Sequence, residues 1–137
     1  MLDNRDLKEL TLDDLQVLCK DIRDNIVLNV SKNGGHLSSN LGVVELTVML
    51  HYIFDLPKDK LLFDVSHQCY THKILSGRSL DDLRKINGIS GFYNREESEY
   101  DCYYSGHSST SISTSLGMAV ARDLKQEDNE ILTKMVW

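Results

Sequence analysis

The sequence predicts an α/β fold, in which an incomplete parallel sheet is flanked by helices, and three observations lead to this prediction. Residues 61–65 form a short apolar run without helical periodicity, as expected of a buried parallel strand. Residues 131–137 resemble the start of a second strand. Most other segments carry apolar residues at three- and four-residue spacing, which is typical of amphipathic helices. A chain of 137 residues is long enough for one domain with a hydrophobic core.

Two helices are predicted before the first strand. The first begins after Thr11, since residues 11–14 resemble a capping box with Asp in place of the usual Glu, and it ends before Gly34. Its apolar stripe is formed by Leu15, Leu18, Ile22, Ile26 and Val30. The second helix covers residues 43–54, and Asn40 is its expected N-cap.

The segment between the two strands is predicted to contain three helices and a long loop. Residues 68–75 fit a helix, and a capping pattern at Ser79 predicts a short helix that closes at Asn87 and Gly88. Residues 88–105 show no sustained periodicity, so we expect an ordered loop, and loops of this length are often functional.

Small hydroxyl residues lead into the last predicted helix, which Ser108 or Ser109 can cap. Its apolar stripe, which we expect to pack in the core, consists of Ile112, Leu116, Ala119, Val120 and Leu124. No Asp or Glu lies between Cys102 and Met118, so the amides at this helix end can face an anion or a polar cofactor. A capped core helix fits this stretch equally well.

The composition argues against several functional classes. With 15 basic and 21 acidic residues and no basic cluster, binding to nucleic acid or to an anionic membrane surface is disfavoured. The longest apolar run, residues 46–54, is far shorter than the ~20 residues of a membrane span. The first ten residues do not resemble a targeting leader, and three widely spaced cysteines fit free thiols, so we expect a cytoplasmic protein.

Three histidines beside glycines or a strand end are candidate site residues. His36 follows two glycines, His67 lies at the carboxyl end of the first strand, where open α/β sheets bind ligands, and His107 follows a glycine. Taken alone, each also fits a turn or core position. A metal site formed by His67, Cys69 and His72 is disfavoured because a fourth ligand is lacking.

Taken together and in order, three blocks of the sequence resemble the 1-deoxy-D-xylulose-5-phosphate synthases. They are GGHLSSNLGVVELT at residues 34–47, DVSHQ with HKILSGR at residues 64–78, and GISGF, ESEYD and GHSSTSIS at residues 88–113. The resemblance implies the thiamine-diphosphate-binding fold of transketolase-type enzymes. It also implies that residues 1–137 are a truncated N-terminal domain, without the pyrimidine-binding and C-terminal domains.

The resemblance implies an enzyme that joins pyruvate and glyceraldehyde 3-phosphate with loss of carbon dioxide, for isoprenoid, thiamine and pyridoxal phosphate synthesis. By the same resemblance His67, Gly106, His107 and Ser108 contact thiamine diphosphate, and His36 lies near the reacting carbons. A histidine there can protonate the aldehyde oxygen near neutral pH. Members of the family are homodimers, so we expect this chain to dimerise or to dock with the remainder of the enzyme.

The sequence also departs from the family pattern. Ser66 stands where the family commonly has glycine, and Thr71 where many members have proline. In the family a Gly-Asp-Gly segment and a later Asn hold the Mg²⁺ that bridges the diphosphate, and residues 131–137 supply neither. We therefore expect the isolated 137-residue chain to have no synthase activity.

Two alternatives stay open at this point. The chain can be a non-catalytic binding or interaction module, or a remnant, of the same fold. It can also belong to another transketolase-type enzyme, such as transketolase or a pyruvate dehydrogenase component, although the spacing from Tyr100 to the 106–113 block fits the synthases best.

Overall fold

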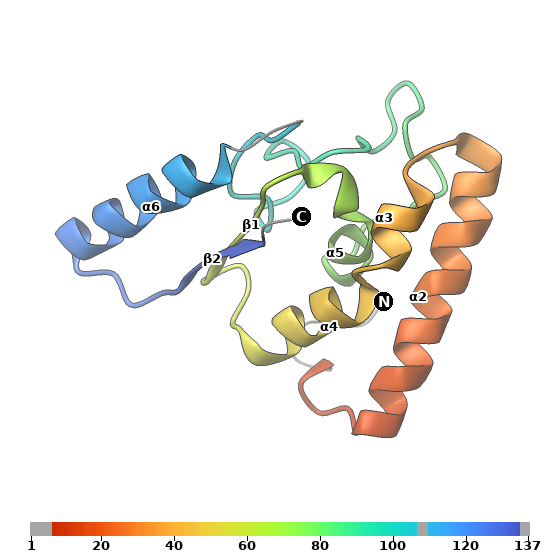
Figure 1. The fold of residues 1–137 in the computed structure, drawn as a ribbon, viewed down its shortest axis with the longest axis horizontal. Helices are drawn as coiled ribbons and strands as arrows, with labels where there is room; N and C mark the ends of the chain where they lie inside the picture. The colour runs from red at the N-terminus through yellow and green to blue at the C-terminus, as the bar shows by residue number, and fades with distance from the viewer. Residues whose placement is uncertain (1–6, 107–109, 135–137) are drawn as a thin grey trace.

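The two predicted strands pair in parallel in the computed structural model, which describes residues 7–106 and 110–134 (Figure 1). Strand β1 (Lys60–Phe63) pairs with β2 (Ile131–Lys134) without a register shift, from the first residue of each strand to the last. The apolar side chains of β1 are buried, as its sequence requires. The predicted α/β class with a small parallel sheet is therefore confirmed.

The helices lie before β1 or between β1 and β2 in the sequence. Before β1 come α2 (Leu12–Asn33), α3 (Leu37–Leu41) and α4 (Val44–Ile53). Between β1 and β2 the chain passes through the 3₁₀ helix η1 (Ser66–Gln68), α5 (Tyr70–Leu75), a long loop and α6 (Ser111–Lys125). Figure 1 shows α2 and α6 at opposite ends of the molecule, with the remaining elements between them.

Helix α2 begins as its sequence predicts. Thr11 caps the helix by accepting from the Asp14 N–H, and the Asp14 carboxylate accepts from the Thr11 N–H in return, which completes the capping box. Gly34 is the C-cap, with a φ of 74° that favours glycine. The predicted stripe faces the core, where Leu15, Ile22 and Ile26 are buried.

The second predicted helix is confirmed as α4, but a short helix that was not predicted, α3, precedes it, and Asn40 is not the N-cap of α4. Asn40 lies inside α3, and its fully buried side chain is bonded to other segments instead. Gly42 ends α3, and α4 starts after Val43 without a side-chain cap. The prediction failed because an Asn before an apolar helix is a strong local signal, whereas its side chain has partners far along the sequence.

The predicted helix at residues 79–88 is also wrong, because this segment forms successive turns. Arg84 and Asn87 have φ values of 63° and 62°, and left-handed residues interrupt a right-handed helix. The predicted loop at residues 88–105 is confirmed.

Helix α6 forms as predicted, but its apolar stripe does not pack in the core. Leu116 is 64% exposed and Leu124 is 81% exposed, and Ile112 and Val120 are exposed as well. The helix contacts β1 and β2; its Ser111 is buried, and Met118 packs partly buried against the core. An apolar stripe of helical period indicates a surface that packs against something, and within the described residues nothing covers this one.

Among the described residues, no helix combines the length and the apolar character that crossing a membrane requires.

The packing of α2 is tested by two neighbouring substitutions. Ile26 is fully buried, so Ile26→Ala is expected to lower the free energy of unfolding by about 2–5 kcal/mol. Val27 is 45% exposed, so Val27→Ala is expected to change it by no more than about 0.5 kcal/mol. Urea denaturation followed by circular dichroism measures both. Equal losses for the two variants would contradict the packing of this helix.

Candidate functional site

The structure brings together two of the histidines that the sequence indicates. The ring centroids of His36 and His67 are 4.9 Å apart, and the Phe92 ring lies 5.7 Å from that of His36. His36 precedes α3, His67 belongs to η1 just after β1, and Phe92 comes from the long loop. Three segments that are distant in sequence thus meet beside the carboxyl end of β1.

Asn40 holds the two histidine segments together. Its side-chain nitrogen donates to the carbonyl oxygens of His36 at 2.6 Å and of His67 at 2.7 Å, and its side-chain oxygen accepts from the Tyr70 N–H at 2.9 Å. Because Asn40 is fully buried, each of these bonds replaces one to water. Asn40 was predicted to cap a helix. Its place four residues after His36, one helical turn, lets it bond the His36 carbonyl oxygen instead.

Tyr70 orients the His36 side chain. Its hydroxyl accepts from the His36 backbone N–H at 3.3 Å and lies 3.5 Å from His36 Nδ1. Burial raises the pKa of Tyr70, so the hydroxyl stays protonated at neutral pH and can donate to Nδ1. When the Tyr70 hydroxyl donates to Nδ1, a single ring proton of His36 is carried on Nε2. A Cβ on Gly35 would lie 2.8 Å from the Tyr70 hydroxyl, so this contact requires a glycine.

Gly106 lies at the same place. Its carbonyl oxygen accepts from the Ser66 N–H at 3.4 Å, which sets it beside the turn that carries His67. Gly106 is exposed, and a Cβ built on it would have no neighbour within 4 Å. This glycine therefore faces open space into which a ligand can fit closely. His107 and Ser108, the other two predicted cofactor contacts, lie outside the described residues.

The amino end of α6 is not free of acidic groups. The Ser111 hydroxyl donates to Asp64 Oδ1 at 2.7 Å, and both side chains are buried. Thr110 is the N-cap and makes no side-chain cap bond. The sequence around this helix end lacks Asp and Glu, but the fold brings in the carboxylate that follows β1. The prediction that this helix end faces an anion is thereby weakened.

A buried polar network fixes the long loop near the site. Asp101 accepts from His72 Nε2 at 3.0 Å, from both terminal nitrogens of Arg78, and from the Asn94 N–H at 2.8 Å. Burial alone would raise the pKa of Asp101, but the bonds from His72 and Arg78 hold this pKa well below its ordinary value. Asp101 is therefore a buried carboxylate whose negative charge is balanced.

His51 and His72 are fully buried in this network, a role that was not predicted from the sequence. His51 Nε2 lies 2.9 Å from His72 Nδ1. Because ionised Asp101 can only accept, His72 carries its proton on Nε2, and His51 donates to His72 Nδ1. Burial lowers the pKa of both imidazoles, and that of His51 falls well below its ordinary value. Both rings are neutral at pH 7, and neither reaches the surface.

Glu97 is the second carboxylate that holds the loop. It accepts from Lys73 Nζ and from Arg78, and its other oxygen accepts from the Ser90 N–H at 2.7 Å and from Asn94 Nδ2 at 3.3 Å. A segment without helix or strand depends on such side chains for its backbone bonds. The loop that carries Phe92 is therefore fixed by buried charges.

The described residues do not supply a divalent-metal site. No three His, Cys, Asp or Glu side chains among residues 7–106 and 110–134 are grouped closely enough to hold a metal ion. The carboxyl end of β2 instead carries Lys134, whose Nζ donates to Gln68 Oε1 at 3.0 Å and lies 5.2 Å from the centre of the Phe63 ring. Burial lowers the pKa of Lys134 to about 8. A cation at this strand end does not fit a Mg²⁺ ligand set.

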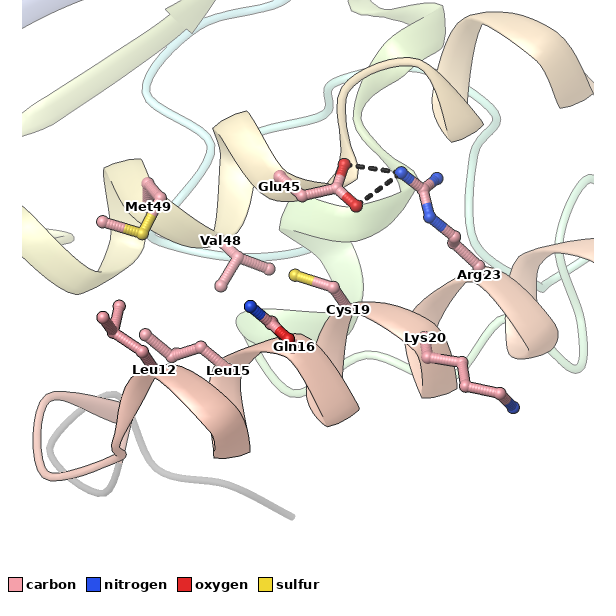
Figure 2. A pocket seen from close by; sticks show the side chains of 9 residues that line it. All are labelled: Leu12, Leu15, Gln16, Cys19, Lys20, Arg23, Glu45, Val48 and Met49. Carbon is pink, nitrogen blue, oxygen red and sulfur yellow. Dashed lines mark hydrogen bonds and ion pairs between the residues drawn. The ribbon is translucent and has the colours of Figure 1, made fainter.

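A groove on the surface lies away from the histidines. It is a groove of about 450 Å³ between α2 and α4. Figure 2 shows apolar side chains along it, with the Cys19 thiol facing Val48, and an ion pair between Arg23 and Glu45 at one end. Burial raises the pKa of Cys19, so its thiol is neutral and weakly nucleophilic. This groove presents no group suited to acid–base chemistry, and we place the candidate site at the histidine cluster.

Two adjoining histidines and an exposed glycine thus lie at the carboxyl end of a parallel strand, the edge at which open α/β sheets commonly bind ligands. The family model described as 1-deoxy-D-xylulose-5-phosphate synthase matches residues 1–135. The chain belongs to this family.

Individual relatives agree with the family model. The chain is 58% identical over 129 residues to the 1-deoxy-D-xylulose-5-phosphate synthase of Desulforudis audaxviator. The aligned region covers 93% of this chain and 20% of the relative. It is 57% identical to the Clostridium tetani synthase, over 93% of this chain and 21% of the relative. A probable chloroplastic synthase of Capsicum annuum is 56% identical over 92% of this chain and 18% of the relative.

The chain thus spans about a fifth of the length of the curated relatives that it matches. Because some relatives are described as chloroplastic, the expected cytoplasmic location stays a prediction.

The two buried histidines predict a stability that depends on pH. Unfolded histidine has a pKa of about 6.5, and both native pKa values are lower, so the unfolded chain binds more protons below this pH. The free energy of unfolding is therefore expected to fall as the pH decreases from about 7 to 5.5. Urea denaturation at several pH values measures the slope.

A variant identifies the group that titrates. His51→Gln keeps an N–H donor toward His72 but cannot take up a proton, so the slope is expected to decrease by about 1.4 kcal/mol per pH unit, the value for one proton. An unchanged slope would contradict a neutral, buried His51.

Proposed function

We propose that this chain forms the thiamine-diphosphate-binding unit of a 1-deoxy-D-xylulose-5-phosphate synthase, with the diphosphate-binding fold of transketolase-type enzymes. The observation that carries the proposal is the meeting of His36, His67 and Gly106 beside the carboxyl end of β1, in a chain of this family. The substrates would be pyruvate and glyceraldehyde 3-phosphate, with loss of carbon dioxide.

The residues present fit the organic cofactor. Gly106 faces open space, and the neighbouring rings of His36, His67 and Phe92 offer flat surfaces and polar edges to a heterocycle. His67 and Gly106 would contact the cofactor, and His107 and Ser108 are proposed to do so from outside the described residues. When bound, thiamine diphosphate supplies the carbon nucleophile that attacks a keto acid.

His36 would act on the second substrate. With Nδ1 directed at the Tyr70 hydroxyl, Nε2 would carry the proton that His36 gives to a developing alkoxide. Asn40 fixes the backbone of His36 relative to His67, so the proton donor and the cofactor contact keep a set separation. His36 thus would protonate the aldehyde oxygen as the new carbon–carbon bond forms.

The Mg²⁺ that the family uses is not assigned to any residue of the described part of this chain, since no ligand set fits it there. We therefore keep the expectation that the 137-residue chain by itself forms no product from pyruvate and glyceraldehyde 3-phosphate. Homodimer formation stays a prediction.

A second candidate function rests on a different observation. The exposed apolar side chains Ile112, Leu116, Val120 and Leu124 recur every four residues along α6. Such a row favours a non-catalytic interaction module that docks through α6. Leu116→Glu would abolish docking to a partner and leave binding of thiamine diphosphate unchanged, which separates the two functions.

Cofactor binding tests the main proposal. Titration of the ¹⁵N-labelled chain with thiamine diphosphate is expected to shift the amide signals around His67 and Gly106 in a saturable manner. His67→Gln is expected to weaken the affinity about tenfold, since it removes one contact worth about 1.4 kcal/mol.

The control is Val27→Ala, a change at an exposed position of α2 outside the site and outside the loop network. It is expected to leave the dissociation constant unchanged at pH 7.5. Equal affinities for His67→Gln and the unsubstituted chain, or no saturable shift in the unsubstituted chain, would contradict the proposal.

A further inference from the structure

Ser66 is the first residue of η1, shortly after the end of β1 and directly before His67. It is fully buried. Its φ does not lie in the left-handed region, because the described non-glycine residues with positive φ are Arg84, Asn87 and Gln126. The backbone at this position therefore accepts a side chain without strain.

The Ser66 hydroxyl joins two parts of the long loop. It donates to the Ser105 carbonyl oxygen and accepts from the Tyr93 N–H at 3.1 Å. The backbone N–H of Ser66 adds a third bond, to the Gly106 carbonyl oxygen at 3.4 Å. One residue thus binds the segment before Gly106 and the segment after Phe92.

Both partner segments are also tied to β1. The Ser105 hydroxyl donates to the Phe63 carbonyl oxygen at 3.3 Å, and the Tyr93 hydroxyl donates to the carbonyl oxygens of Leu61 and Tyr100. Ser66 lies where these bonds meet, and it directly precedes His67 in sequence. A hydroxyl at this point can therefore set the distance between the His67 side and the Gly106 side of the site.

We propose that Ser66 is a positioning residue, whose hydroxyl holds the Ser105–Gly106 turn against the His67 turn so that both keep their places at the candidate cofactor site. This inference rests on the proposed function and names a role that a glycine cannot fill. The hydroxyl points into the loop and does not crowd the cofactor, because the Ser105 carbonyl and the Tyr93 N–H take up its donor and one acceptor position.

Hydrogen exchange tests the positioning without any ligand. In Ser66→Ala, the amides of residue 66 and of Tyr93 are expected to exchange about tenfold faster relative to the Ile26 amide, which reports global opening. The control is Ser31→Ala, which removes an exposed hydroxyl bonded to the Leu28 carbonyl oxygen and is expected to leave these ratios unchanged. Should Ser66→Ala not fold, Ser66→Cys replaces it in the same comparison.

Affinity then tests whether the turn serves the cofactor site. Ser66→Ala is expected to weaken binding of thiamine diphosphate about tenfold, while Ser31→Ala changes it less than about twofold. A merely structural role would leave the affinity of folded Ser66→Ala unchanged, and this result or unchanged exchange ratios would overturn the inference. No thiamine diphosphate binding by the unsubstituted chain would contradict the proposed function alone, and the exchange ratios would still decide whether Ser66 holds the turn.

Discussion

The buried carboxylate of Asp101 is the constraint on which the arrangement of this chain depends. Residues 76–106 contain no helix or strand, yet this segment supplies Phe92 and Gly106 to the candidate site. The carboxylate of Asp101 sets the position of this segment, because it accepts hydrogen bonds from His72 and from the positively charged Arg78. A buried charge left without these partners costs several kcal/mol, so the loop and α5 are held in one arrangement.

The candidate site is built on the same principle with neutral groups. Asn40 gives its two donors and its acceptor to three backbone groups, and the segments of His36, His67 and Tyr70 meet as a result. A fully satisfied buried amide tolerates little displacement, because any shift leaves a polar atom without a partner. The spacing of the two histidines therefore follows from buried hydrogen bonds and not from contact between their rings.

Much of the secondary structure could be predicted from the sequence, since several of its determinants lie within a few neighbouring residues. The Thr11 capping box, the Gly34 helix end and the apolar run of β1 follow from local hydrogen bonding and burial. The histidines of the candidate site could be found only through the resemblance to the synthases, because His36 and His67 taken alone fit ordinary turn positions. The turns at residues 79–88 were missed because a capping pattern does not reveal a later left-handed residue.

The sequence by itself determined the α/β class, the family and most of the helix and strand segments, because periodicity and motifs are properties of neighbouring residues. Only the tertiary structure decided the rest. It gave Asn40 partners 27 and 30 residues away, placed Asp64 against α6, and left the apolar stripe of α6 uncovered. These outcomes depend on which distant groups meet in the fold, and the local pattern of a sequence carries no record of that.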